Sequence, residues 1–185
     1  MLISSIDSDN NLFQVTELVP PVLVEQIVNT PWLDLKWIRQ EGQESWPRRR
    51  ILDTEIPWIA EWNQYLQSQW SAISTAVGTP LQDSPATIFW LDEPGFVCPI
   101  HTDGEMEGSL HVSWIGKPNL GTCFYHYKNP KTVRHEFKLE SNNGYIMLNN
   151  SDEIGYRKLQ WHGMLNPVPV NTYRLTSYTW VYSSK

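Results

Sequence analysis

Residues 86–104 read ATIFWLDEPGFVCPIHTDG, and this stretch decides the fold. It holds two short runs of apolar and β-branched residues, 86–91 and 97–101, on either side of the turn-forming Pro94-Gly95. The same pattern continues along the chain and predicts strands at 86–91, 97–101, 109–114, 122–127, 134–139, 145–148, 158–162 and 173–182. So many short strands within about 100 residues indicate an antiparallel sandwich or jelly roll.

The preceding half of the chain carries the helical patterns. Pro20-Pro21 lead into a short helix predicted at 22–28, which ends before Pro31. A longer helix is predicted at about 56–77, because apolar residues recur there at steps of three and four. Residues 32–39 alternate as a strand does. We expect one domain, 1–185, in which residues 1–85 support a β core at 86–185 and the helices pack on one face of the larger sheet.

The composition argues against several classes of function. The chain has 185 residues and a formal net charge of −6, so it lacks the basic footprint that coating a nucleic acid requires. Its two cysteines, Cys98 and Cys123, indicate reduced thiols rather than a disulfide framework. The chain starts without a signal-peptide pattern, and no apolar stretch reaches the roughly 20 residues that cross a bilayer. We therefore expect a cytoplasmic protein with no membrane partner, and the charge argues against a nucleic-acid partner. The oligomeric state stays open.

His101 and Asp103 stand two residues apart at the end of a predicted strand. Side chains at this spacing on a strand project to the same face, so the imidazole and the carboxylate can converge. His162, on a late predicted strand, is the candidate for a second imidazole. Two histidines and one carboxylate on one face of an octahedral ion leave three positions open, as in non-haem Fe(II) oxygenases. The combination predicts a metal site, although each histidine taken alone is more often a structural residue bonded to a backbone carbonyl.

Arg174 follows His162 by twelve residues, across a connection that looks like a link between two antiparallel strands. A hairpin centred on Val168 would place residue 174 opposite residue 162. We then expect the arginine to lie one strand from the metal, where its guanidinium can bind the far carboxylate of a five-carbon diacid whose other end chelates the ion. Thr176 lies on the same face of this strand as Arg174 and can add a hydroxyl donor.

These segments resemble the 2-oxoglutarate/Fe(II)-dependent oxygenase superfamily. Residues 90–95 with 99–103 resemble the turn and strand that enter its H-x-D site, and residues 143–148 resemble its strand before the distal histidine. His162-Gly163-Met164 followed by Arg174-Leu175-Thr176 is similar to its signature of distal histidine, co-substrate arginine and small hydroxyl residue. The resemblance covers about residues 86–182. It implies a double-stranded β-helix that uses Fe(II), 2-oxoglutarate and O2 to oxidise a substrate C–H bond while releasing succinate and CO2.

Two departures from related branches bear on the substrate. Prolyl 4-hydroxylase relatives typically place a lysine where Arg174 stands, and the nucleic-acid demethylases typically have a second arginine at the position of Trp180. We therefore expect hydroxylation of an amino-acid side chain, either in a small molecule or in a peptide or protein. Trp114, Tyr125 and Trp161 lie close in sequence to the site strands and are the candidates for substrate contact. The run 48–50, three arginines, is interpreted as a solvated loop or edge strand.

Two other hypotheses remain. One is a cupin-like barrel that uses the same ligands for another metal, as a different enzyme or as a binding module, with Arg174 dispensable. The other is a non-enzymatic jelly-roll module in which His101, Asp103 and His162 do not converge.

Overall fold

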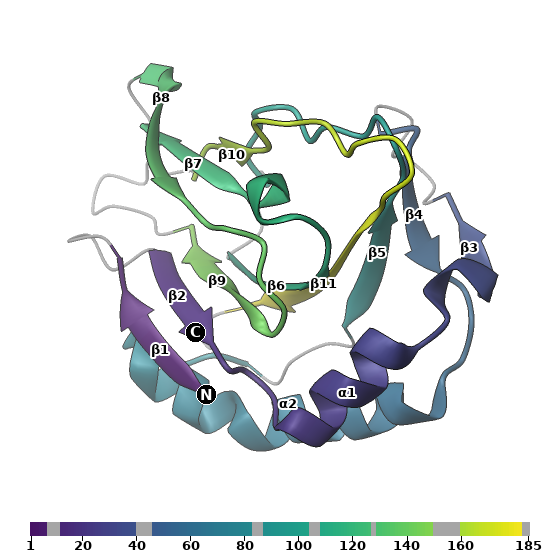
Figure 1. The fold of residues 1–185 in the computed structure, drawn as a ribbon. Helices are drawn as coiled ribbons and strands as arrows, with labels where there is room; N and C mark the ends of the chain where they lie inside the picture. Colours follow the sequence, from purple (N-terminus) through teal and green to yellow (C-terminus); the bar gives the residue numbers. More distant parts are fainter. Residues whose placement is uncertain are drawn as a thin grey trace.

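The computed structural model contains two antiparallel sheets that face each other, with helices on the outer side of the larger one (Figure 1). It describes residues 1–6, 12–39, 46–82, 87–103, 108–126, 129–149 and 160–182. The large sheet has the strand order β1 (Leu2–Ser5), β2 (Leu12–Thr16), β9 (Asn143–Leu148), β6 (Gly108–Ile115), β11 (Arg174–Val181), β5 (Ile88–Asp92), β4 (Arg49–Leu52), β3 (Trp37–Ile38). The small sheet has the order β10 (His162–Gly163), β7 (Cys123–His126), β8 (Asn129–Glu136).

The α-helices are α1 (Pro21–Asn29) and α2 (Pro57–Val77), and short 3-10 helices occur at Trp32–Asp34 and Pro118–Leu120.

From β5 onward the chain passes back and forth between the two sheets. After β5 in the large sheet, His101 forms an isolated antiparallel bridge with His162 in β10 of the small sheet. The chain then enters β6 in the large sheet, β7 and β8 in the small sheet, and β9 in the large sheet. It finishes with β10 in the small sheet and β11 in the large sheet. This alternation makes a double-stranded β-helix, which confirms the predicted fold class.

Helix α2 attaches the helical layer to the large sheet. Its buried residues recur at steps of three and four, which gives the helix one apolar face, and they are Trp58, Trp62, Leu66, Trp70, Ile73 and Val77. Trp62 packs edge-to-face on Trp114 of β6 at 5.3 Å between ring centroids, and its Nε1 donates to Thr87 Oγ1 at 2.7 Å. Gly78, at φ 69° in the left-handed region, ends the helix. The two predicted helices and their position on one face of the larger sheet are confirmed (Figure 1).

Several predicted strands differ from the structure. The strand predicted at 32–39 is a 3-10 turn followed by the two-residue β3. The chain curls there because the Trp32 indole is buried in the core and its Nε1 donates to Ile27 O at 2.7 Å. The strand predicted at 97–101 forms only the His101–His162 bridge. The strand predicted at 158–162 overlaps β10 at His162, and residues 158–159 lie outside the described residues.

The N-terminal part adds strands that the sequence did not predict. β1 and β2 extend one edge of the large sheet, and β4 joins β5 near the other edge. In β1, buried and exposed residues do not alternate, because three of its four residues are exposed. Its sequence therefore has no period-2 hydrophobic pattern. Among the described residues, no helix is both long enough and apolar enough to span a membrane.

We predict that Trp62→Ala destabilises the fold. The side chain is fully buried between α2 and the large sheet, so its removal leaves a cavity and should lower the free energy of unfolding by about 3–5 kcal/mol. Chemical denaturation measures this change. Val22→Ala, at a position on α1 that is 61% exposed, is the control and should change the free energy by less than about 0.5 kcal/mol. Equal effects of the two substitutions would contradict the packing described above.

Candidate functional site

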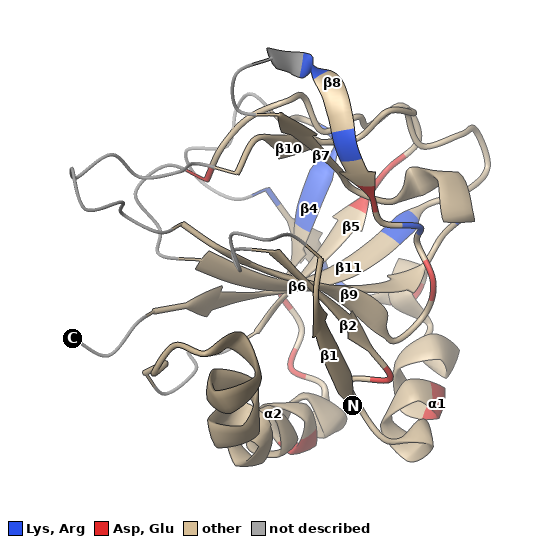
Figure 2. Cartoon of the chain, turned by 90° about the vertical axis from the view of Figure 1, so that its left-hand side faces the viewer, with Lys and Arg blue, Asp and Glu red and all other residues tan. Residues whose placement is uncertain are grey.

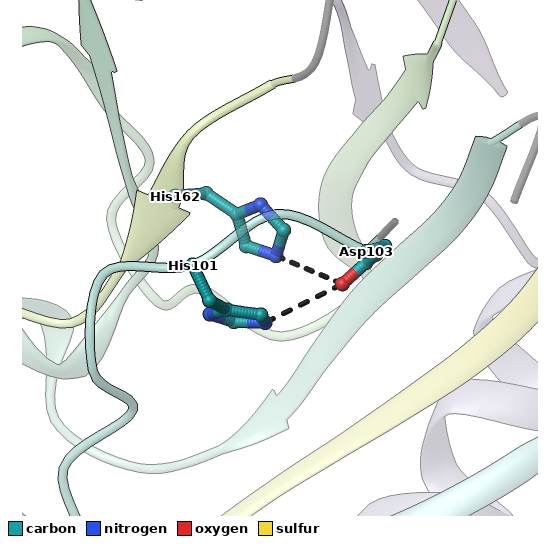
Figure 3. Close-up of side chains that lie close together, drawn as sticks. All are labelled: His101, Asp103 and His162. Carbon is teal, nitrogen blue, oxygen red and sulfur yellow. Dashed lines mark ion pairs between the residues drawn. The ribbon is translucent and has the colours of Figure 1, made fainter. Parts of the chain in front are cut away.

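His101, Asp103 and His162 converge between the two sheets (Figure 3). The backbone bridge positions the two histidines, because His101 N–H donates to His162 O and His162 N–H donates to His101 O, both at 2.9 Å. Asp103 follows two residues after His101, and its Oδ1 lies 3.4 Å from His101 Nε2 and 3.5 Å from His162 Nε2. The side chains predicted to form a metal site are therefore brought together.

The spacing of the three side chains fits one metal ion. Their ligand atoms all lie within 4.8 Å of one another. Two ligands that bind an ion at about 2.1 Å and at right angles are about 3 Å apart, so the observed separations need only a small adjustment. The arrangement supplies one face of an octahedron and leaves the opposite face to other ligands.

Neighbouring groups fix which atoms face the ion. His101 Nδ1 donates to Pro99 O at 2.8 Å, and His162 Nδ1 donates to Gln160 O at 2.9 Å. Both imidazoles therefore direct Nε2 to the centre of the site. The Tyr178 hydroxyl donates to Asp103 Oδ2 at 3.2 Å, which leaves Oδ1 toward the histidines. Hydrogen bonds of this kind orient metal ligands before the ion arrives.

The charges within the triad suit a cation. Burial alone would raise the pKa of Asp103, but hydrogen bonds from His101 and His162 hold it well below its usual range. Burial lowers the pKa of His101, whereas hydrogen bonds to Asp103 and Cys98 raise it, and the balance is a pKa of about 10. The Asp103 carboxylate is thus ionised, and a proton on His101 stands where an ion would bind.

The triad opens into a small pocket with a cavity volume of about 30 Å³. Residues from both sheets line it, namely Trp46, Arg49, Trp90, Cys98, His101, Asp103, His111, Thr122, Tyr145, His162, Gly163, Met164, Arg174 and Tyr178. Three of these residues carry a buried nitrogen without a hydrogen-bond partner among the described residues, namely Trp90 Nε1, His111 Nε2 and Arg174 Nε. The Trp90 and Arg174 nitrogens can only donate, so the pocket fits an acceptor-rich ligand such as a carboxylate.

Arg174 lies in this pocket, but the predicted hairpin with His162 is wrong. Residue 162 lies in the small sheet, opposite His101 on one side and Phe124 on the other, whereas Arg174 begins β11 in the large sheet opposite Asp92. Arg174 reaches the pocket because the two sheets face each other. Its Nη1 donates to Asp92 Oδ2 at 2.6 Å, and its Nη2 donates to Thr122 Oγ1 at 3.4 Å. Thr176 is buried on the same face of β11, and its hydroxyl has no partner among the described residues.

The three candidates for substrate contact do not line the pocket. Trp114 points to the opposite side of the large sheet, where it packs on Trp62 and its Nε1 donates to Ser177 Oγ at 2.9 Å. Tyr125 is buried in β7, where its backbone N–H donates to the carbonyl of Trp161 at 2.8 Å. Trp161 precedes His162 in the chain, and neighbouring residues of an extended segment face opposite sides. Closeness in sequence therefore did not identify the pocket residues.

The sequence did not predict some of the residues that line the pocket. Arg49 belongs to the arginine run interpreted as solvated, yet it is only 5% exposed, and no sequence signal marked it. His111 Nδ1 is hydrogen-bonded to the Tyr145 hydroxyl at 2.5 Å, and burial, followed by the charge of Arg174, holds the pKa of His111 well below its usual value. A signal did exist for Tyr178, because it follows Arg174 and Thr176 at even spacing on one face of β11.

Comparison with solved structures identifies the fold. A prolyl-4-hydroxylase from Pseudomonas putida matches with a TM-score of 0.62 at 14% identity, over 95% of this chain and 94% of that chain. HygX from Streptomyces hygroscopicus, solved with nickel, 2-oxoglutarate and hygromycin B bound, matches with a TM-score of 0.63 at 11% identity, over 95% and 84% of the two chains. The non-haem α-ketoglutarate-dependent epimerase SnoN from nogalamycin biosynthesis matches with a TM-score of 0.61 at 10% identity, over 94% and 78%. The sequence itself matches no protein-family model and no curated protein sequence.

The chain therefore has the double-stranded β-helix fold of the 2-oxoglutarate/Fe(II) oxygenases, as its motifs led us to expect. Within that fold its own residues place a His-Asp-His cluster beside a buried arginine.

We predict that the affinity for a divalent ion rises with pH. The pKa of His101 is raised to about 10 in the metal-free site, so an ion that binds near neutral pH must displace a proton. Between about pH 6 and about pH 8 the dissociation constant should fall about tenfold per unit for each proton displaced. Calorimetric titration with Ni(II) at several pH values measures it. An affinity independent of pH over this range would contradict the protonated state.

We also predict that Tyr178→Phe weakens metal binding. The change removes the hydroxyl that orients Asp103 and keeps the ring, which stacks on Trp90 at 4.8 Å between centroids. The dissociation constant for Ni(II) should rise at least about tenfold, as for other residues that orient metal ligands. Tyr182→Phe, at a position 38% exposed, is the matched control and should leave the constant unchanged. An unchanged constant in Tyr178→Phe would mean that Asp103 needs no orienting bond.

Proposed function

We propose that this chain is a non-haem Fe(II)- and 2-oxoglutarate-dependent dioxygenase that hydroxylates an amino-acid side chain, in a small molecule or in a peptide or protein. The observation that carries the proposal is the convergence of His101, Asp103 and His162 in the same pocket as the buried Arg174. A metal site and a carboxylate site within one pocket suit a co-substrate that chelates the ion at one end and carries a carboxylate at the other.

In this proposal, separate groups of residues bind the metal ion and the co-substrate. His101 Nε2, His162 Nε2 and Asp103 Oδ1 hold the ion, and their hydrogen bonds to Pro99, Gln160 and Tyr178 keep these atoms directed at it. Arg174, with its unpartnered Nε, receives the distal carboxylate of 2-oxoglutarate, and Thr176 contributes its hydroxyl. When bound, Fe(II) and 2-oxoglutarate supply the means to activate O2 and oxidise a C–H bond, and 2-oxoglutarate leaves as succinate and CO2.

The charge of the chain and the rim of the pocket bear on the substrate class. The net charge of −6 disfavours a nucleic acid, and Trp180 occupies the position at which the demethylase branch typically has a second arginine. Among the described residues, Trp46 contributes an aromatic ring to the rim of the pocket. This ring packs edge-to-face on His101 at 5.0 Å between centroids. An amino-acid side chain that presents one C–H bond to the metal suits such a rim.

A second candidate function is a cupin-like barrel that binds a metal for another enzymatic or binding role. The ion pair between Arg174 and Asp92 favours it, because this pair gives the arginine a partner within the protein. Under this hypothesis 2-oxoglutarate does not bind, and Arg174 has only a structural role.

Anaerobic titration with Fe(II) and then 2-oxoglutarate distinguishes the two functions. We expect the weak visible metal-to-ligand charge-transfer band of the chelate in the unmodified protein. His162→Ala should abolish the band because a ligand is lost. Arg174→Ala should raise the 2-oxoglutarate concentration needed for the band at least about tenfold, with iron binding little changed.

Matched controls are His126→Ala and Arg48→Ala, two exposed positions outside the pocket lining, and both should keep the band. Iron binding without a band from 2-oxoglutarate would establish the cupin-like alternative instead. A protein that binds neither ligand would overturn both functions.

A further inference from the structure

Three charged residues form a row across the inner face of the large sheet. Arg49 on β4 is paired directly with Asp92 on β5, and Asp92 is paired directly with Arg174 on β11. β4, β5 and β11 lie side by side in Figure 2, with β5 in the middle. Because directly opposed residues of an antiparallel pair project to the same face, all three side chains meet at one end of the pocket.

The central carboxylate is shared between two guanidiniums. Arg49 donates from Nε to Asp92 Oδ1 at 2.7 Å and from Nη2 to Oδ2 at 3.1 Å. Arg174 donates from Nη1 to the same Oδ2 at 2.6 Å. The exposed fractions are 5% for Arg49, 0% for Asp92 and 1% for Arg174, so water does little to screen these charges.

The row carries one unbalanced positive charge. Two guanidiniums contribute two positive charges, and one carboxylate contributes one negative charge. Asp92 and Arg174 alone would form a closed neutral pair that offers an incoming carboxylate little attraction. Arg49 neutralises the Asp92 carboxylate through two hydrogen bonds. The positive charge of Arg174 then remains available to a ligand.

Arg49 is held firmly in this position. Its guanidinium carbon lies 4.3 Å from the centroid of Trp90, 4.6 Å from that of Phe96 and 4.7 Å from that of Trp46. Aromatic faces at this range attract a cation and restrict its movement. The surroundings therefore fix Arg49 as a partner of Asp92 and do not leave it to follow a ligand.

We propose that Arg49 is a positioning residue that neutralises Asp92 and so keeps Arg174 available to the distal carboxylate of the co-substrate, which makes the pocket selective for a 2-oxo diacid over a 2-oxo monoacid. The inference rests on the proposed function and adds the residue that decides the preference for a second carboxylate.

The test compares two ligands that differ only at the distal end, 2-oxoglutarate and 2-oxopentanoate, which has a methyl group in place of the second carboxylate. Calorimetric titration of the Ni(II)-loaded protein gives both dissociation constants without turnover. The unmodified protein should bind the diacid at least about tenfold more tightly. Arg49→Met removes the charge but keeps the chain length, so it should reduce this preference about tenfold and leave the monoacid constant within about threefold.

A double variant separates charge from packing. Arg49→Met with Asp92→Asn removes the carboxylate as well, so Arg174 again carries an unbalanced charge, and most of the preference for the diacid should return. A preference no better than that of Arg49→Met alone would overturn the proposal, as would an Arg49→Met variant with the preference of the unmodified protein.

Arg49→Lys keeps the charge and provides the test should Arg49→Met fail to fold. It should keep a clear part of the preference, because the ammonium still balances the charge of Asp92 although the two-fold hydrogen bonding is lost, and complete loss of the preference would refute the charge argument. Failure of the proposed function looks different, because the unmodified Ni(II)-loaded protein would then bind neither 2-oxo acid.

Discussion

The backbone bridge between His101 and His162 is the contact on which the rest of the site depends. Its two hydrogen bonds of 2.9 Å join a segment that follows β5 to a segment that precedes β11. Both imidazoles thereby enter the site from one edge of the small sheet, and Asp103 is near enough along the chain to complete the cluster. The large sheet supplies the remaining groups from the opposite side, Tyr178 toward Asp103 and Arg174 at the end of the pocket.

The division of residues between two faces of the large sheet explains why so small a chain can build this pocket. On β11, Arg174, Thr176 and Tyr178 have even spacing and face the small sheet, whereas Leu175 belongs to the core beneath the helices. The aromatic packing of α2 on the outer face leaves the inner face free for polar groups. A shift of β11 by one residue would bury Leu175 in the pocket and expel Arg174, so the register of the sheet also sets the chemistry.

The metal cluster was predictable from the sequence, and the basic end of the pocket was predictable only in part. His101 and Asp103 were found because their spacing of two residues is a local pattern, although the structure has a single bridge at His101 in place of the predicted strand, and His162 was found because few histidines lie on late predicted strands. The expected geometry of Arg174 was wrong, since β10 lies in the small sheet and β11 in the large sheet, so these two strands do not form a hairpin. Arg49 gave no signal because its partner, Asp92, is distant in sequence and the pairing of β4 with β5 is a tertiary contact.

The orphaned donors are groups that a pocket arranged for a ligand, and not for stability, would contain. Trp90 Nε1 and Arg174 Nε are buried without acceptors among the described residues, and each such group costs about 1–3 kcal/mol relative to one that is hydrogen-bonded. A protein selected for stability alone would place apolar side chains there, because a packed apolar row is at least as stable as a buried charged one. A carboxylate that enters the pocket recovers this energy only if it meets both donors and the unbalanced charge of the Arg49–Asp92–Arg174 row. Under the proposed function, the groups that weaken the empty protein are thus the groups that would give the ligand its affinity.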